Sequence, residues 1–150
     1  MQGPLRTVPG ASPSATNRNA STLPKRRFVA LTAPTATGET AITNVAAATV
    51  RKVYGLIQED CPAGKSVSVH RLGEGIAESD GSATIAEGDL LTVVGTSSVA
   101  TAGRVAKLAA SPSSGSYMVV GQAKSAVGTT DGGEEVRIEL CTPYLVYVPA

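Results

Sequence analysis

Hydrophobic and polar residues alternate along several stretches of this chain with a period of two, which is the pattern of a β-strand with one buried face. In residues 66–69 serines alternate with valines, and in residues 135–140 aliphatic residues alternate with charged ones. Residues 44–52 are rich in alanine and leave a helix as an alternative in that region. Further strands are expected at residues 28–31, 40–45, 50–57, 75–78, 90–94, 104–108, 117–123 and 141–148.

Short strands separated by turns that contain glycine or proline are typical of a β-sandwich or a small barrel. No stretch predicts a long amphipathic helix. The sequence therefore predicts an all-β fold for residues 28–150, built as a small β-sandwich or barrel of short antiparallel strands.

Residues 1–27 have a different character. They show no strand or helix periodicity, and they hold five of the 13 basic residues and none of the 12 acidic ones. Such a segment cannot bury enough apolar surface to offset its chain entropy, so we expect disorder up to about residue 23. The basic triplet at residues 25–27 could equally be a solubilising flank of the first strand. We interpret residues 1–27 as an extended basic N-terminal arm, with partner contacts by Arg6, Arg18, Lys25, Arg26 and Arg27.

The chain is poor in aromatic residues. Its 150 residues include no Trp, one Phe and four Tyr. Aromatic side chains contribute much of the area of cores and ligand pockets, so their scarcity predicts a thin core and favours a scaffold over an enzyme. A thin core often gains stability by association with copies of itself or with a larger surface.

Neither of the two cysteines, Cys61 and Cys141, belongs to a CxxC motif. They could pair if the fold brings them together, but two reduced thiols are the favoured interpretation. No apolar run reaches the roughly 18 residues of a membrane helix, and the N-terminus lacks the apolar segment of a signal peptide. We therefore expect synthesis in the cytoplasm and no membrane contact.

The motifs that could carry chemistry are weak. Gly64, Lys65 and Ser66 resemble the end of a phosphate-binding loop, but Glu59 stands where that loop needs a glycine, and a strand is expected where it needs a helix. His70 is the single histidine and lies in no nucleophile-elbow spacing. We predict no catalytic residue, cofactor or metal site.

Five acidic residues cluster in and around turns, and solvated turn positions are their default interpretation. Their spacing does not match an EF-hand. The basic arm is sparse in charge and has no interleaved aromatic residue for base stacking, so a protein surface is favoured over nucleic acid as its partner. The five acids are Glu74, Glu78, Asp80, Glu87 and Asp89.

An ordered set of short motifs resembles the decoration (cement) proteins of bacteriophage capsids. Residues 63–69 (AGKSVSV) resemble the first turn and strand of that family, and residues 85–91 (IAEGDLL) resemble its central segment. Further pieces lie, in the same order, at residues 75–77, 103–107, 120–123 and 133–140. The resemblance covers about half of the chain. The basic arm and the strand after Pro143 depart from a minimal member.

The resemblance implies a structural virion protein that binds the major capsid protein on the outside of the capsid and stabilises the lattice. It also implies self-association, as a trimer or else a dimer. The alternative is a head-fibre or tail-associated β module that binds host glycans. The tyrosines available for sugar stacking in such a module are Tyr54, Tyr117, Tyr144 and Tyr147.

Overall fold

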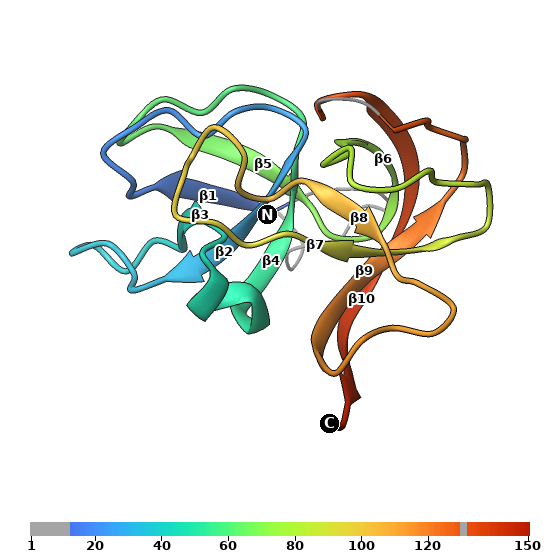
Figure 1. Cartoon of the computed structure of the whole chain (residues 1–150). Helices are drawn as coiled ribbons and strands as arrows, with labels where there is room; N and C mark the ends of the chain where they lie inside the picture. The colour runs from blue at the N-terminus through green and yellow to red at the C-terminus, as the bar shows by residue number, and fades with distance from the viewer. Residues whose placement is uncertain (1–12, 130–131) are drawn as a thin grey trace, which may run out of the picture.

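The structure, a computed structural model, describes residues 13–129 and 132–150, and its regular secondary structure is almost entirely β-strand. The first half of the chain forms a closed barrel, and the second half forms a five-stranded sheet beside it (Figure 1). The predicted all-β fold is confirmed. The barrel strands are β1 (Ser14–Asn17), β2 (Arg27–Thr32), β3 (Ala41–Asn44), β4 (Val53–Ile57) and β5 (Ser66–His70). The sheet strands are β6 (Gly73–Glu78), β7 (Leu90–Val93), β8 (Val105–Lys107), β9 (Gly115–Ala123) and β10 (Glu135–Val148).

The barrel has the strand order β1-β3-β2-β4-β5 and closes because β1 also pairs with β5. Most of its pairs are antiparallel as predicted, but β1 and β3 are parallel. The alternation in residues 66–69 is confirmed, since both valines of β5 are buried and its serines are exposed.

The expected disorder is wrong from Ser14 onwards. Strand β1 is hydrogen-bonded along both edges, to β3 and to β5. The sequence pattern did not reveal this strand, because its four residues are short or polar and take their partners from distant parts of the chain. Residues 1–12, with Arg6, lie outside the described residues. A division of the chain at residue 27 stays a prediction.

The region in which a helix was the alternative contains both elements. A 3-10 helix, η1 (Ala47–Lys52), precedes β4. The Thr49 side chain stabilises the first turn, because its hydroxyl accepts a hydrogen bond from the backbone N–H of Ala46 at 2.9 Å. The strand therefore begins three residues later than predicted.

The sheet has the order β6-β10-β9-β7-β8. Its longest strand, β10, confirms the alternation in residues 135–140, whose aliphatic side chains are buried and whose charged side chains are exposed. The separate last strand predicted at residues 141–148 is instead a continuation of β10. Its register against β9 shifts between Leu140 and Tyr144, at Pro143, which has no backbone N–H to donate.

Two apolar clusters form the core, and β2 contributes to both. Phe28 and Ala30 point into the larger cluster, which lies between the barrel and the sheet. Val29 points the other way, into the barrel interior, where it packs with Ile42 and Val69. One strand is thus buried on both faces, and it joins the two halves of the molecule into one packed body.

Candidate functional site

The predicted contact residues of the arm occupy different environments. Arg18 and Lys25 are exposed, and Arg26 is partly exposed beside Glu135, with 2.9 Å between Nη2 and Oε1. Arg27 is buried. The structure therefore leaves Arg18 and Lys25 as the most accessible cations among the four that it describes.

Asn17 anchors the segment that carries Arg18 to the barrel. Its side chain is fully buried and donates hydrogen bonds from Nδ2 to the carbonyl oxygens of Ser21, at 3.0 Å, and Cys61, at 2.8 Å. Its Oδ1 accepts a hydrogen bond from the backbone N–H of Asn19 at 2.7 Å. Leu23 then forms a β-bridge with Cys61. Arg18 is therefore presented from a fixed loop, and its Nη1 donates to a backbone carbonyl at 2.8 Å.

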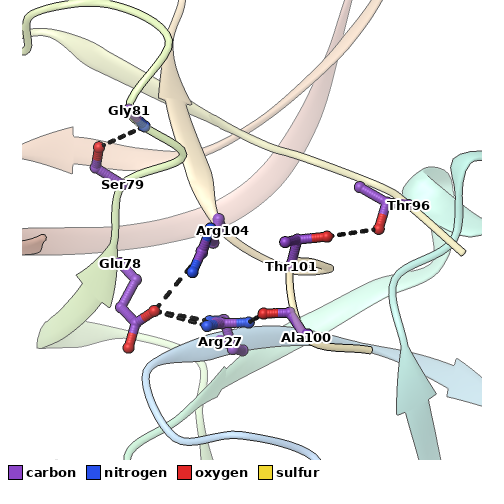
Figure 2. Close-up of polar contacts among 8 residues, drawn as sticks. All are labelled: Arg27, Glu78, Ser79, Gly81, Thr96, Ala100, Thr101 and Arg104. Carbon is purple, nitrogen blue, oxygen red and sulfur yellow. Dashed lines mark hydrogen bonds and ion pairs between the residues drawn. The ribbon is translucent and has the colours of Figure 1, made fainter. Parts of the chain in front are cut away.

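Arg27 lies at the junction of barrel and sheet, in a cluster with Glu78 and Arg104 (Figure 2). Its Nη2 and Nε donate to Oε2 of Glu78 at 2.7 and 3.2 Å, and its Nη1 donates to the carbonyl of Ala100 at 2.7 Å. Arg104 Nε lies 3.6 Å from the same Glu78 oxygen. A buried guanidinium with these partners is held in place by charge-assisted hydrogen bonds.

This cluster, the Arg27–Glu78–Arg104 cluster, links β2 of the barrel to the end of β6 in the sheet. The loop that carries Ala100 is itself fixed by a hydrogen bond between the hydroxyls of Thr96 and Thr101 at 3.1 Å (Figure 2). The position of Arg27 argues against the contact role predicted for it, because its donors are already used inside the protein.

The segment that resembles a phosphate-binding loop is a β-turn leading into β5. The backbone N–H of Gly64 donates to the carbonyl of Asn17 at 2.8 Å, and that of Lys65 donates to Pro62 at 3.1 Å. Because these donors are occupied and a strand begins at Ser66, the segment cannot cradle a phosphate as a P-loop does. His70 ends the same strand and is partly buried.

The five clustered acids differ in their surroundings. Glu74 is exposed and pairs with Arg137 of β10 at 3.1 Å. Asp80 accepts hydrogen bonds from the backbone N–H and hydroxyl of Ser82 at 3.0 and 2.7 Å, which closes the turn, and Glu87 is exposed. The interpretation as solvated turn residues is wrong for Glu78, which lies in β6 with its side chain only 14% exposed in the Arg27–Glu78–Arg104 cluster.

Asp89 closes a second turn. Its Oδ2 accepts a hydrogen bond from the backbone N–H of Ala86 at 2.8 Å and lies 3.4 Å from Lys107 Nζ. The hydrogen bond from Ala86, and then Lys107, hold the pKa of Asp89 below its usual value. This carboxylate is ionised near neutral pH and stabilises the entry to β7.

The two cysteines are not paired in the structure. Cys61 is buried inside the barrel, whereas Cys141 is partly exposed in β10. Burial raises the pKa of both thiols. Their thiolate fraction at neutral pH is therefore low, as expected for structural cysteines.

A groove of about 430 Å³ lies over β7, β9 and β10. Leu90, Leu140, Cys141 and Tyr144 give it an apolar wall, and Gln122 and Glu139 line its polar side. Sequence reasoning did not find this groove, because it depends on the register shift in β10.

Across residues 13–129 and 132–150, no group of three or more His, Cys, Asp or Glu side chains is placed to hold a metal ion. The same residues contain no helix long and apolar enough to span a membrane.

Comparisons with known proteins give a likeness of structure. No family model matches the chain, and no curated protein matches its sequence. Among solved structures, the chain is similar to the N base of the head fiber protein gp8.5 of bacteriophage phi29, with a TM-score of 0.59 and 20% identity. The match covers 91% of this chain and 98% of that chain. The likeness shows that the two chains share a fold, barrel and sheet together.

Proposed function

We propose that this protein is a structural, non-enzymatic component of a bacteriophage head, bound to the major capsid protein on the outside of the capsid. The observation that carries the proposal is the fold shared with a head-fibre base over nearly the full length of both chains. The motifs that could have carried catalysis have structural roles instead. The phosphate-loop-like segment forms a turn, and Glu78 belongs to a buried ion cluster.

Within this class, we propose the base of a head fibre as the particular role. The matching structure is itself a base module, and the whole of it is matched. A decoration protein that reinforces the lattice is the second candidate, supported by the ordered motifs between residues 63 and 140. The trimer that the resemblance implies stays a prediction in both cases.

Experiments on purified virions distinguish the head-fibre role from the decoration role. Quantitative mass spectrometry of purified particles should find the protein in fixed proportion to the major capsid protein. Antibody labelling in electron micrographs should place it at the root of fibres that project from the head. A lattice-wide distribution without fibres would support the decoration role instead. Absence of the protein from purified virions would refute both.

For the contact surface, we propose Arg18 and Lys25, because both are exposed on the barrel. Reversing both charges, Arg18→Glu with Lys25→Glu, should weaken co-sedimentation with heads purified from a mutant phage that lacks this protein. Wild-type binding should also weaken as salt rises, since exposed charges are screened over about 10 Å at 0.1 M salt.

The matched control reverses two exposed charges elsewhere, Arg51→Glu with Lys52→Glu, at the end of η1. Both double variants change the net charge equally, so a general electrostatic effect would weaken both. Equal loss in the two variants would contradict a specific contact by Arg18 and Lys25. Full binding by the first variant would exclude these two residues from the contact. Whether the protein attaches to the capsid at all is tested separately, by the mass spectrometry of purified virions.

A further inference from the structure

The distal parts of β9 and β10 form a two-stranded ribbon that extends beyond the rest of the sheet. In this ribbon, defined as residues 115–119 and 144–148, the two strands pair only with each other over most of its length. Strand β6 pairs with β10 only as far as Leu140, and β7 meets β9 only from Val119 onwards. Figure 1 shows the ribbon running away from the body, with the C-terminus at its tip.

A two-stranded ribbon alone is at best marginally stable in water. Exposed strand edges are usually protected from pairing by charged residues, especially Lys. This ribbon has no such protection, because residues 108–123 and 140–150 contain no charged residue.

The ribbon instead concentrates the scarce aromatic side chains of the chain. Three of the four tyrosines lie on it, at Tyr117, Tyr144 and Tyr147. Tyr144, Leu145 and Tyr147 are 45%, 39% and 67% exposed. Tyr144 also lines the groove described above, together with exposed Leu90. Tyr144 therefore continues the apolar wall of the groove onto one face of the ribbon, whereas Leu145 and Tyr147 lie on the opposite face, because successive side chains alternate along a strand.

We propose that the ribbon and the adjoining groove form the interface with a second copy of this chain. The exposed parts of Tyr144 and Tyr147 amount to about 220 Å², if a whole aromatic side chain offers about 200 Å². A standard interface buries about 800 Å² on each partner, of which about 65% is apolar in homodimers. The two tyrosines thus supply about 40% of the apolar area that such an interface needs, and exposed Leu90 and Leu145 add to it. Because Tyr144 and Tyr147 lie on opposite faces of the ribbon, the second copy packs against both faces.

The absence of charge from the ribbon selects the occupant. A partner recognised through charge would find no complementary group on the ribbon, and Glu139 at the polar side of the groove already lies 3.6 Å from Lys124 Nζ. An identical copy offers an equally uncharged, apolar surface and an equally open strand edge. The proposed interface is also separate from the exposed cations on the barrel, so self-association leaves those cations available for another partner. This inference concerns the protein in solution and does not depend on capsid binding.

The first experiment measures oligomeric state by sedimentation velocity across a dilution series of the full chain. Wild-type protein should be a dimer or larger oligomer at micromolar concentration. Leu145→Lys and Tyr147→Lys should each weaken association at least about 30-fold, as expected for residues central to an interface. A wild-type protein that stays monomeric up to about 100 times that concentration would overturn the proposal.

Leu31→Lys is the matched control, because Leu31 is an exposed strand leucine in the barrel with 38% exposure against 39% for Leu145. It should leave association unchanged. Unchanged thermal unfolding of Tyr147→Lys, or of the milder Tyr147→Ser, verifies that the ribbon variants are folded. Equal weakening by the Leu31 and Leu145 variants would refute an interface on the ribbon.

The second experiment uses the thiol in the groove as a reporter. Cys141 lines the groove beside Tyr144, whereas Cys61 is buried in the barrel and serves as the internal reference. At one fixed pH, Cys141 should react with a maleimide at least about tenfold more slowly at high than at low protein concentration. In Leu145→Lys this dependence should disappear. A Cys141 rate that does not vary with concentration, in a wild-type protein shown to be oligomeric, would place the interface elsewhere.

If wild-type protein is monomeric and the ribbon variants instead lose capsid binding, the ribbon contacts the capsid protein. That result would also overturn the proposal.

Discussion

Replacing Glu78 by Gln tests whether the Arg27–Glu78–Arg104 cluster holds barrel and sheet together. The substitution keeps the shape of the side chain and removes its charge, so the buried guanidinium of Arg27 and the partly buried one of Arg104 lose this counterion. The side chains of Arg27 and Glu78 are only 7% and 14% exposed. Breaking a buried ion pair by removing one partner costs about 3–5 kcal/mol of unfolding free energy.

The matched control is Glu135→Gln, which breaks the pair between Arg26 and Glu135. The two pairs have similar distances, 2.9 Å here against 2.7 Å in the cluster. The control side chains are 29% and 52% exposed, so solvent screens their attraction. Exposed pairs contribute about 0–1 kcal/mol. Burial is therefore the main difference between the two substitutions.

Urea unfolding followed by far-UV circular dichroism measures both losses, and thermal melting checks them. For a domain of this size, the Glu78 variant should melt about 6–20 °C lower, and the control no more than about 4 °C lower. The dependence of unfolding free energy on urea should keep its slope, because the surface exposed on unfolding is nearly unchanged. A loss at Glu78 no larger than that at Glu135 would refute the structural role of the cluster.

Gly103→Ala should destabilise the protein by about 1–3 kcal/mol more than Gly38→Ala in urea unfolding. Both glycines have φ of 82°. A Cβ at Gly103 would lie 2.2 Å from the carbonyl oxygen of Phe28, whereas a Cβ at Gly38 would meet no atom within 4 Å. Equal losses of unfolding free energy in the two variants would contradict this contact. The low pKa of Asp89 in the folded protein predicts stability that is fully present above its unfolded pKa of about 3.9 and is lost as the pH falls through the folded value. The melting temperatures of wild type and Asp89→Asn should therefore differ at pH 7 and converge near pH 2, and a pH-independent difference would contradict the role of this carboxylate.

The sequence predicted strands well where one face is buried and the other is wet. In β5 and the first half of β10 the alternation of side chains follows directly from that environment. The pattern was less informative in β2, where all of the first four residues are buried because the strand is covered on both sides. Alternation there is invisible, although the apolar run itself still indicated a strand.

The contact residues and the apolar surface were harder to predict. Arg27 was grouped with its neighbours by charge, and nothing in the local sequence shows that Glu78, far along the chain, neutralises it inside the protein. The tyrosines of β10 were treated as scattered candidates for sugar stacking, because their placement on one ribbon depends on the pairing of β10 with β9. Properties fixed by contacts between distant segments leave no local signal.

The position of β2 has a mechanical consequence. Strand β2 opposes a hinge between barrel and sheet, because rotation would separate Phe28 and Ala30 from the sheet residues of the larger cluster, such as Ile138. A force applied at the ribbon tip is therefore transmitted through the sheet to the barrel without rotation at the junction between them. A protein anchored by its barrel would hold that tip at a constant angle to the surface beneath it.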